Sequence, residues 1–362
     1  MIALTIAGVL ALIAFCNVVA FLALVRLHPR RKAIAVAMLV IGNVMWAFFP
    51  ILNARTDFAR AVRAVFGPPW FAWVCFVILY SAYIAIAAVI ARPYLKFASR
   101  LFLWCTLVAL IAGVYGALVP LRVDDVVVKL RNLPPSLDGF QIAEIADLHV
   151  GLFTRPSRLE TIFVTAALLH PDAIILAGDN IDDDPVFTPK LLDAVRHIPP
   201  AIPVFAVLGN HEMYGAPEEA IARLRRSRVR LLVNEGAAIG DLWLAGISDY
   251  AARLPQLRPN MQAAIANRGS RFPIVIAHQP KAFDDALRLA LPFTICAHTH
   301  GGQFGFRPLR WSLAGVFLPY HMGLYQRGAS QLYVNTGTGY WLLPWRLGIT
   351  PEISLIELRR VK

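Results

Sequence analysis

Five short apolar runs in the second half of the chain constrain the fold, because each ends in a residue that can hold a metal ion. Each run is rich in Ile, Val, Leu and Ala, a pattern typical of a buried strand. In open α/β sheets, ligands bind just beyond the carboxyl ends of the strands. The sequence therefore predicts one crevice that gathers the following side chains: Asp147, His149, Asp179, Asn210, His211, His278, His298 and His300.

These donor types indicate a pair of divalent ions. Carboxylate, imidazole and amide groups suit Mn, Fe or Zn, and the absence of Cys ligands argues against a structural zinc. A single His at a strand end is more often incidental. Here His298 and His300 alternate around Thr299, so in an extended strand both side chains would lie on the same face. Gly301 and Gly302 would then let the backbone turn close to the ions.

The first 120 residues have a different composition. Hydrophobic residues make up 57% of the chain and concentrate there. Four segments are long enough to cross about 30 Å of hydrocarbon, at Ile2–Leu27, Ala33–Leu52, Trp70–Ala91 and Leu101–Val119. We therefore expect two domains, a bundle of about four transmembrane helices at residues 1–120 and an α/β domain at 121–362.

The net charge of +12 does not indicate nucleic-acid binding. Residues 1–120 hold ten Lys/Arg and one Asp, whereas residues 121–362 hold 25 Lys/Arg and 22 Asp/Glu. The excess therefore belongs to loops between membrane helices, where orientation and anionic lipid explain it. The first and third loops carry seven basic residues, and the second loop with the segment after the fourth helix carries six. This bias favours cytoplasmic first and third loops and an α/β domain on the outer face.

Two local features are open to two interpretations each. The stretch Asn53–Phe66 is amphipathic, which fits an interfacial helix or an extension of the next membrane helix. The four cysteines show no spacing typical of a disulfide framework or a zinc finger, so they fit either compartment.

Strands and helices alternate in the second domain. Helices are predicted at 156–170, 188–197, 217–227 and 282–289, where apolar residues recur at helical spacing. A short strand is expected at Val126–Leu130, and late strands at Gln331–Asn335 and Ile353–Leu358 are expected to complete a second sheet. The order favours a layered α/β fold.

The polar motifs resemble a known family. Asp147-Leu-His149, Gly178-Asp179-Asn-Ile-Asp182, Gly209-Asn210-His211-Glu212, His278 and His298-Thr-His300-Gly-Gly-Gln303 match the calcineurin-like metallophosphoesterases in order. The tail around 323–325, 332–339 and 346–353 resembles the membrane-associated bacterial, YkuE-like branch. The resemblance covers about residues 125–362 and implies two packed β-sheets flanked by helices.

This resemblance also implies roles for the residues. One divalent ion would be bound by Asp147, His149, Asp179 and His300. Asp179 would bridge to a second ion, bound by Asn210, His278 and His298. A metal-bound hydroxide would attack the phosphate ester. His211 would protonate the leaving oxygen, and Asp182 would hold His211.

The substrate is constrained by one departure from relatives and by two apolar stretches. Protein phosphatases of this superfamily carry an Arg where Asp183 stands, which counts against a phosphoprotein. The stretches at 304–320 and 340–345 are aromatic, with interleaved Arg residues. They fit a membrane interface, an amphiphilic phosphate ester or a packed cap over the site. We therefore expect a phosphodiester or lipid-linked ester, with a soluble nucleotide or sugar phosphate as the next candidate.

A second function class is open as well. The helices could form a membrane sensor or binding protein whose metallophosphoesterase-like domain is not catalytic. The complete ligand set argues against this alternative. The expected partners are membrane lipids and a phosphate ester, in a bacterial inner membrane, with the catalytic domain on the periplasmic or extracellular face. The oligomeric state is left open.

Overall fold

Two compact units make up the computed structural model, which describes residues 2–44, 56–152 and 154–361. Contacts divide the chain into Met1–Ala112 and Gly113–Lys362, here called the N-terminal and C-terminal units. The predicted domain boundary at residue 120 stays a prediction.

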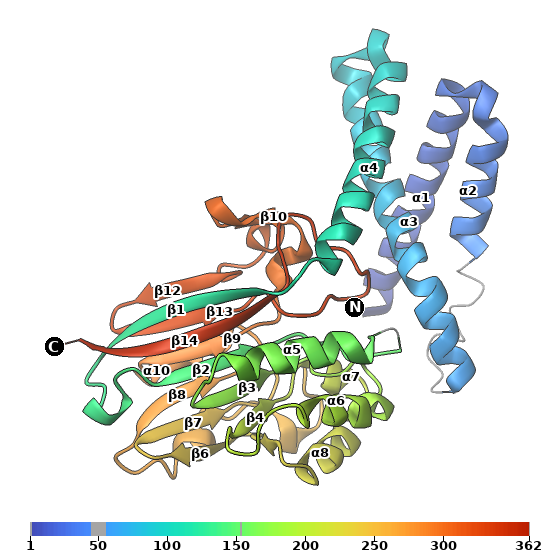
Figure 1. The fold of residues 1–362 in the computed structure, drawn as a ribbon. Coiled ribbons are helices and arrows are strands. Elements are labelled where there is room, and N and C mark those ends of the chain that lie inside the picture. Colours follow the sequence, from blue (N-terminus) through green and yellow to red (C-terminus); the bar gives the residue numbers. More distant parts are fainter. Residues whose placement is uncertain (1, 45–55, 153, 362) are drawn as a thin grey trace. The chain divides into compact units, whose positions relative to one another are not determined.

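The N-terminal unit is helical (Figure 1). Its helices are α1 (Ile2–Leu27), α2 (Lys32–Val44), α3 (Asp57–Ile90) and the greater part of α4 (Leu95–Leu118). Three described segments are long and apolar enough to cross a membrane: Gly8–Leu27, Asp57–Ile90 and Arg92–Leu118. The remaining predicted span, Ala33–Leu52, is the second in chain order. It coincides with α2 as far as Val44, and the rest of it lies outside the described residues.

Helix α3 decides between the two interpretations of the stretch 53–66. Thr56 caps the helix by accepting a hydrogen bond from the backbone N–H of Ala59. From Asp57 the helix runs without a break to Ile90, past Pro68 and Pro69. The described part of the stretch is therefore an extension of the long helix, and residues 53–55 lie outside the described part.

A few polar side chains join the helices of the N-terminal unit. The Oδ1 of Asn17 in α1 accepts hydrogen bonds from Asn43 Nδ2 of α2 at 3.0 Å and from Trp73 Nε1 of α3 at 3.1 Å. The hydroxyl of Ser81 in α3 donates to the carbonyl of Cys16 in α1 at 2.8 Å. In an apolar environment such bonds satisfy groups that would otherwise lack a partner.

Two six-stranded sheets form the C-terminal unit (Figure 1). The first has the order β1 (Arg122–Arg131), β14 (Glu352–Val361), β2 (Gln141–Ile145), β3 (Ala173–Ala177), β4 (Val204–Val207) and β5 (Arg230–Leu231). The second has the order β12 (Gly323–Arg327), β13 (Ser330–Val334), β9 (Phe293–Cys296), β8 (Phe272–Ile276), β7 (Leu242–Gly246) and β6 (Glu235–Ile239).

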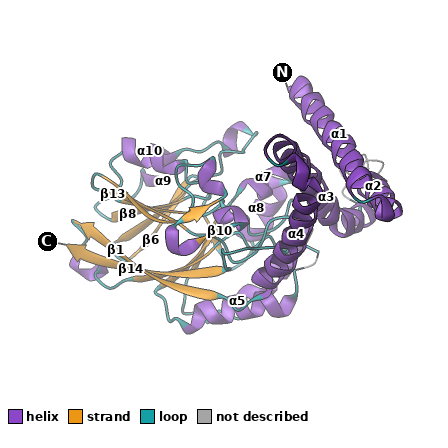
Figure 2. Ribbon diagram, turned by 90° about the horizontal axis from the view of Figure 1, so that it is seen from above, coloured by secondary structure: helices purple, strands orange, loops and turns teal. Residues whose placement is uncertain are grey.

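Helices cover the outer faces of both sheets, as Figure 2 shows from above. The first sheet packs against α5 (Pro156–Leu168), α6 (Thr188–Val195) and α8 (Pro217–Arg225). The second packs against α9 (Met261–Ile265) and α10 (Ala282–Arg288). A third apolar core fills the space between the sheets. The predicted architecture of two packed sheets flanked by helices is confirmed.

One predicted strand belongs to the first sheet, although the sequence analysis placed it in the second. The strand at 353–358 was expected to help complete the second sheet, and it is β14 of the first. It pairs in parallel with β1 over its whole length and antiparallel with β2. Ile353, Ile356 and Leu358 are fully buried, which matches a strand in the interior of a sheet. The strand predicted at 331–335 is β13 and does lie in the second sheet.

Candidate metal centre

All the predicted ligands follow the carboxyl ends of strands. Asp147 and His149 follow β2, Asp179 follows β3, His278 follows β8, and His298 and His300 follow β9, while Asn210 begins the short helix α7 (Asn210–Tyr214) after β4. Five of these seven residues have a positive φ, between 45° and 73°. Asp and His tolerate this left-handed region better than most residues, but it still costs about 1 kcal/mol or more each. The backbone is therefore strained where the ligands converge.

The side chains form three overlapping clusters, and within each cluster the ligand atoms lie within 4.8 Å of one another. The clusters are Asp147–His149–His300, His149–Asp179–His211 and Asp179–His278–His298. Asp179 belongs to two of them, because its Oδ2 lies 3.7 Å from His149 Nε2 and 3.0 Å from His278 Nε2. A shared carboxylate between two sets of imidazoles is the arrangement that a two-ion site requires.

The first half of the centre combines residues from both sheets. The Nε2 atoms of His149 and His300 face each other at 3.0 Å. Oδ1 of Asp147 lies 3.9 Å from His300 Nε2. Behind His149, its Nδ1 lies 3.2 Å from Oδ1 of Asp182. A carboxylate behind a ligating imidazole fixes the ring and leaves the opposite nitrogen for an ion.

The second half is built around His278. Its Nδ1 lies 2.9 Å from the carbonyl oxygen of Ala177, the geometry of an N–H donating to that oxygen. Its Nε2 then faces Asn210 Oδ1 at 3.2 Å and His298 Nδ1 at 3.2 Å. Asn210 and His278 are thus directed at the same point as Asp179.

His298 and His300 reach the centre by a different route from the one predicted. They were expected on one face of an extended strand, but β9 ends at Cys296 and His300 begins a 3₁₀ helix. Left-handed turns at both residues, with φ of 73° and 49°, direct them to different halves. His298 faces His278, and His300 faces His149. Gly301 and Gly302 also have positive φ, as the turn requires.

The partner of His211 differs from the prediction. His211 Nδ1 lies 2.7 Å from Oδ1 of Asp183, whereas the predicted partner, Asp182, contacts His149. The reason is a parallel bridge between Val150 and Ile181, in which the N–H of Asp182 donates to the Val150 carbonyl. This bridge places Asp182 beside the loop after β2, where it contacts His149. The following residue, Asp183, is therefore the one that contacts His211.

Charges within the centre control the protonation of its imidazoles. Burial alone would lower the pKa of His278, but the carboxylates of Asp179 and Asp147 raise it to about 10. Burial likewise opposes charge on His211, and contact with Asp183 outweighs it and raises the pKa to about 9. Burial and the neighbouring His278 lower the pKa of His298 to about 3. His298 is therefore neutral without an ion, whereas His278 would have to release a proton when it binds one.

The donor atoms fit divalent cations. Asp147 is fully buried, and its Oδ2 has no hydrogen-bond partner. A buried carboxylate oxygen without a partner is costly unless a cation or a proton satisfies it. Burial raises the pKa of Asp147 to about 6, which shows how poorly the protein alone compensates its charge. The observed donors are oxygen and imidazole nitrogen, so the set suits Mn, Fe or Zn.

Sequence reasoning missed two residues that support the centre. Glu212 is buried and accepts hydrogen bonds from the backbone N–H groups of Asn180, Ile181 and Gly209, which ties together the loops after β3 and β4. Glu212 stands three residues after Gly209, the spacing of a capping box at the start of a helix. This spacing was the signal in the sequence that could have indicated its role.

The second missed residue, Arg346, is fully buried beside His300. Its Nη2 lies 3.3 Å from His300 Nδ1, and its Nη1 donates to the Thr336 carbonyl at 2.8 Å. Its Nε donates to the Gly339 carbonyl at 2.8 Å. The loop that it holds also contacts the first ligand, because Gly339 N–H donates to the Asp147 carbonyl at 3.1 Å. No local pattern distinguishes this arginine from a surface one.

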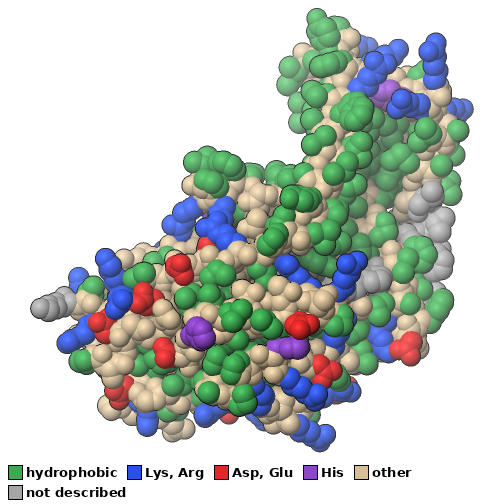
Figure 3. All heavy atoms as spheres, viewed as in Figure 1, with side chains coloured by type: hydrophobic (Ala, Val, Ile, Leu, Met, Phe, Trp, Pro, Cys, Tyr) green, Lys and Arg blue, Asp and Glu red, His purple; other side chains and the backbone are tan. Residues whose placement is uncertain are grey.

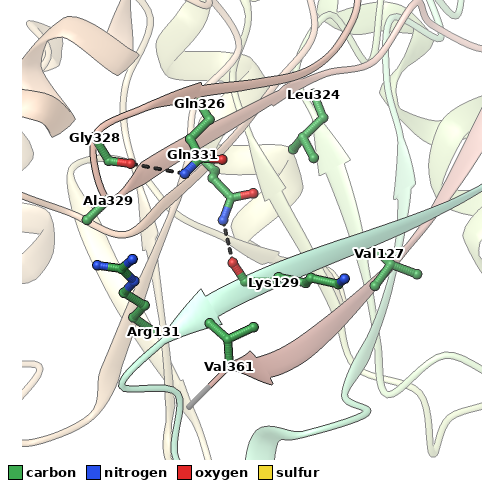
Figure 4. A pocket seen from close by; sticks show the side chains of 9 residues that line it. All are labelled: Val127, Lys129, Arg131, Leu324, Gln326, Gly328, Ala329, Gln331 and Val361. Atoms are coloured by element: carbon green, nitrogen blue, oxygen red, sulfur yellow. Dashed lines mark hydrogen bonds between the residues drawn. The ribbon is translucent and has the colours of Figure 1, made fainter.

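Two other features lie outside the ligand set. Asp249 is buried and accepts from Ala251 N at 2.7 Å and from Gln279 Nε2 at 2.8 Å, so it closes a turn and also holds the neighbour of His278. A cavity of about 500 Å³ lies near β1 and the β12–β13 hairpin and contains none of the predicted ligands (Figure 4). Its lining includes Lys129 and Arg131, at the end of β1 that lies opposite the centre.

Comparisons with known proteins agree with this geometry. Residues 140–302 match the profile of the calcineurin-like phosphoesterase family. A transmembrane protein with metallophosphoesterase domain from Danio rerio is 30% identical over 270 residues, which are 70% of this chain and 61% of that protein. An uncharacterized metallophosphoesterase from Helicobacter pylori is 29% identical over 250 residues, 68% of this chain and 66% of the relative.

A third relative comes from the branch that the tail motifs resemble. The metallophosphoesterase YkuE of Bacillus subtilis is 26% identical over 251 residues, 64% of this chain and 83% of YkuE. The chain thus spans about three fifths to two thirds of the length of the first two relatives. Membrane association is supported by the three long apolar helices among the described residues and by the name of the Danio relative. The predicted resemblance is confirmed: the C-terminal unit contains a calcineurin-like metallophosphoesterase domain, and its homologues include YkuE and a transmembrane protein with metallophosphoesterase domain.

Proposed function

We propose that the chain is a membrane-anchored two-metal phosphoesterase. The observation that supports this most strongly is the convergence of seven donor side chains from two sheets, with Asp179 shared between the two halves. Asp147, His149, Asp179 and His300 would hold one divalent ion, and Asp179, Asn210, His278 and His298 the other. Two ions bound there would supply Lewis acidity that polarises a phosphate ester and activates water.

The remaining work falls to the side chains around the ligands. Asp182 orients His149, and the Ala177 carbonyl orients His278. His211 would act as the general acid that protonates the leaving oxygen. Its contact with Asp183 keeps the imidazole protonated at neutral pH, since the pKa is raised to about 9. Asp183 would therefore have the role that the sequence analysis assigned to Asp182.

The substrate that we propose is a phosphodiester or a lipid-linked phosphate ester. An acidic residue stands at Asp183, where the related protein phosphatases carry a phosphate-gripping Arg, and this departure disfavours phosphoproteins. Exposed aromatic side chains such as Phe304 and Trp341 follow the ligand loop and suit an amphiphilic ester. We place the protein in a bacterial inner membrane with the C-terminal unit on the outer face, as the loop charges suggest.

The test is turnover by the full-length, detergent-purified protein loaded with Mn. Bis-p-nitrophenyl phosphate and p-nitrophenyl phosphate would be compared in wild type and His211→Ala. We expect metal-dependent hydrolysis that falls by about 10²- to 10⁴-fold in the variant, as for loss of a general acid. His197→Ala, outside the centre, is the matched control and should retain full activity. Equal turnover of wild type and His211→Ala would refute the role of His211.

The same experiment distinguishes the other function class. A non-catalytic sensor or binding domain would bind two equivalents of metal and hydrolyse neither ester. In that case His211→Ala would leave both metal content and cellular function intact. Hydrolysis that depends on metal excludes this alternative, and the ratio of the two rates separates a diesterase from a monoesterase.

A further inference from the structure

Exposed apolar side chains gather in one segment of the C-terminal unit, Phe304–Leu318, here called the apolar platform. Eight of the fifteen large hydrophobic side chains that are exposed in the described part of residues 119–361 lie in this segment. Phe317 is 79% exposed and Leu309 is 76% exposed. Figure 3 shows the resulting group of hydrophobic side chains at the place of β10 in Figure 1. Such concentrated exposure marks an interaction surface.

The platform is fixed in place by its own contacts. Its strands β10 (Gly305–Phe306) and β11 (Trp311–Ser312) pair antiparallel. Arg310 Nη2 donates to the Leu324 carbonyl at 2.9 Å, and its guanidinium lies over the ring of Tyr325 at 5.1 Å. The apolar side chains are therefore presented from a folded base, and the packed cap considered in the sequence analysis does not describe them.

The platform adjoins the end of helix α4 through one loop. The ring of Phe304 lies 6.2 Å from that of Trp345, and the N–H of Arg346 donates to the Gly113 carbonyl at 2.8 Å. A Cβ atom at Gly113 would lie 1.9 Å from Trp345 Nε1, and one at Gly116 2.0 Å from the Arg346 carbonyl oxygen. Only glycine at these two positions allows the loop to pack so closely against the helix.

That end of α4 is itself apolar and exposed. Tyr115 is 71% exposed and Leu118 is 68% exposed, at the end of a segment long and apolar enough to cross a membrane. Only three residues separate Leu118 from the start of β1 at Arg122, a connection of at most about 14 Å. The surface from the end of α4 through Trp345 to the platform is thus continuous with a membrane helix, which favours lipid as the occupant.

From this continuity we propose that the apolar platform inserts its side chains into the surface of the bilayer that α4 crosses. The proposal rests on the membrane-anchored function proposed above and adds a second, surface attachment. Phe304 follows the ligand His300 by four positions, so an inserted platform would hold the ligand loop at the level of the lipid headgroups. The substrate class would then be a phosphate ester presented by the bilayer.

The experiment places a fluorescent probe on the platform of the full-length protein in phosphatidylcholine vesicles that contain phosphatidylglycerol. Leu309→Cys and Phe317→Cys would be labelled in a background with Cys75→Ala and Cys105→Ala. Leu168→Cys, 67% exposed at the end of α5, is the matched control. Nitroxide-labelled lipid should quench the platform probes several-fold more than the control probe, and aqueous iodide should quench them less.

Two results would overturn the proposal. One is equal lipid quenching at the platform and at Leu168→Cys. The other is cross-linking of two copies through Phe317→Cys without lipid quenching, which would identify a second copy of this chain as the occupant. If one cysteine variant misfolds, Val316→Cys, 61% exposed, replaces it. Turnover of bis-p-nitrophenyl phosphate by the labelled proteins reports on the proposed function separately, because that soluble ester does not require the platform.

Discussion

The two sheets of the C-terminal unit support their ligands in different ways. The loops after β2 and β3 in the first sheet bond directly to each other: Asp147 N–H donates to the Gly178 carbonyl at 3.1 Å, and His149 N–H donates to the Asp179 carbonyl at 2.9 Å. The loop after β9 in the second sheet depends on the tail instead, through Arg346 beside His300.

This difference separates a local side of the centre, on the first sheet, from a long-range side on the second sheet. In the first sheet, neighbouring strand ends continue their ladder into the loops, so ligand positions follow from strand pairing. In the second sheet the ladder continues only as far as Ala297, whose N–H donates to the His278 carbonyl at 2.9 Å, and His298 and His300 lie in the left-handed turns beyond it. His300 contacts the buried cation Arg346, 46 residues further along the chain, and the N–H of His298 donates to Oδ1 of Asp147 at 3.2 Å. We therefore expect substitutions in the tail to act on the histidine side of the centre.

The largest effect should come from removing the carboxylate that both halves share. Asp179→Asn should leave at most one bound ion, measured by metal analysis of the purified protein. Because Lewis acidity contributes several kcal/mol, turnover should fall by about 10³-fold. Asp172→Asn is the control, since Asp172 accepts from Gln141 N–H at the other end of β3. Two ions in Asp179→Asn with wild-type turnover would show that the halves do not share this ligand.

A smaller effect, on folding stability, should come from the tail. Arg346→Met would leave the carbonyls of Thr336 and Gly339 without their buried donor and should lower the free energy of unfolding by about 3 kcal/mol. Chemical denaturation of the metal-free protein measures this. Arg288→Met, whose side chain is 74% exposed, is the control and should change stability by less than about 0.5 kcal/mol. A similar loss in both variants would contradict the long-range role of Arg346.

The smallest effect tests the local side of the centre, on the first sheet. Asp183→Asn removes the carboxylate that raises the pKa of His211, so the imidazolium should lose its proton at a lower pH. If protonated His211 is the acid, the alkaline limb of the kcat–pH profile should move to lower pH by about one unit, with about a twofold loss near pH 8 that approaches tenfold above about pH 10. Asp182→Asn should move this limb less, because the charge of Asp182 is a weaker influence on His211, and should reduce metal affinity, because Asp182 contacts His149. The reverse pattern would restore Asp182 as the partner.

Much of the fold and of the ligand set was predictable, because apolar runs that end in Asp or His give both the strands and the edge where ligands meet. The pairing of Asp183 rather than Asp182 with His211 was not, since adjacent carboxylates differ only through the bridge between Val150 and Ile181. The left-handed turns at His298 and His300 also have no signature in a single sequence.

Long-range partners set the other limit. The alternation of apolar residues predicts that 353–358 is a strand, yet it carries no information on which sheet accepts it. Arg346 is a similar case, because a lone arginine is usually exposed, and only the folded tail shows that three carbonyl or imidazole partners surround it.

The position of β14 determines when the first sheet can be completed during synthesis. Arg122 at the start of β1 pairs with Glu352, which is 230 positions later. At 5–20 residues per second, β1 leaves the ribosome roughly 10–50 s before its partner strand does. During that interval β1 and β2 lack the strand that joins them, because β14 lies between them in the sheet. The first sheet is therefore complete only when translation has passed β14, although the candidate ligands, the last of which is His300, have all been synthesised by then.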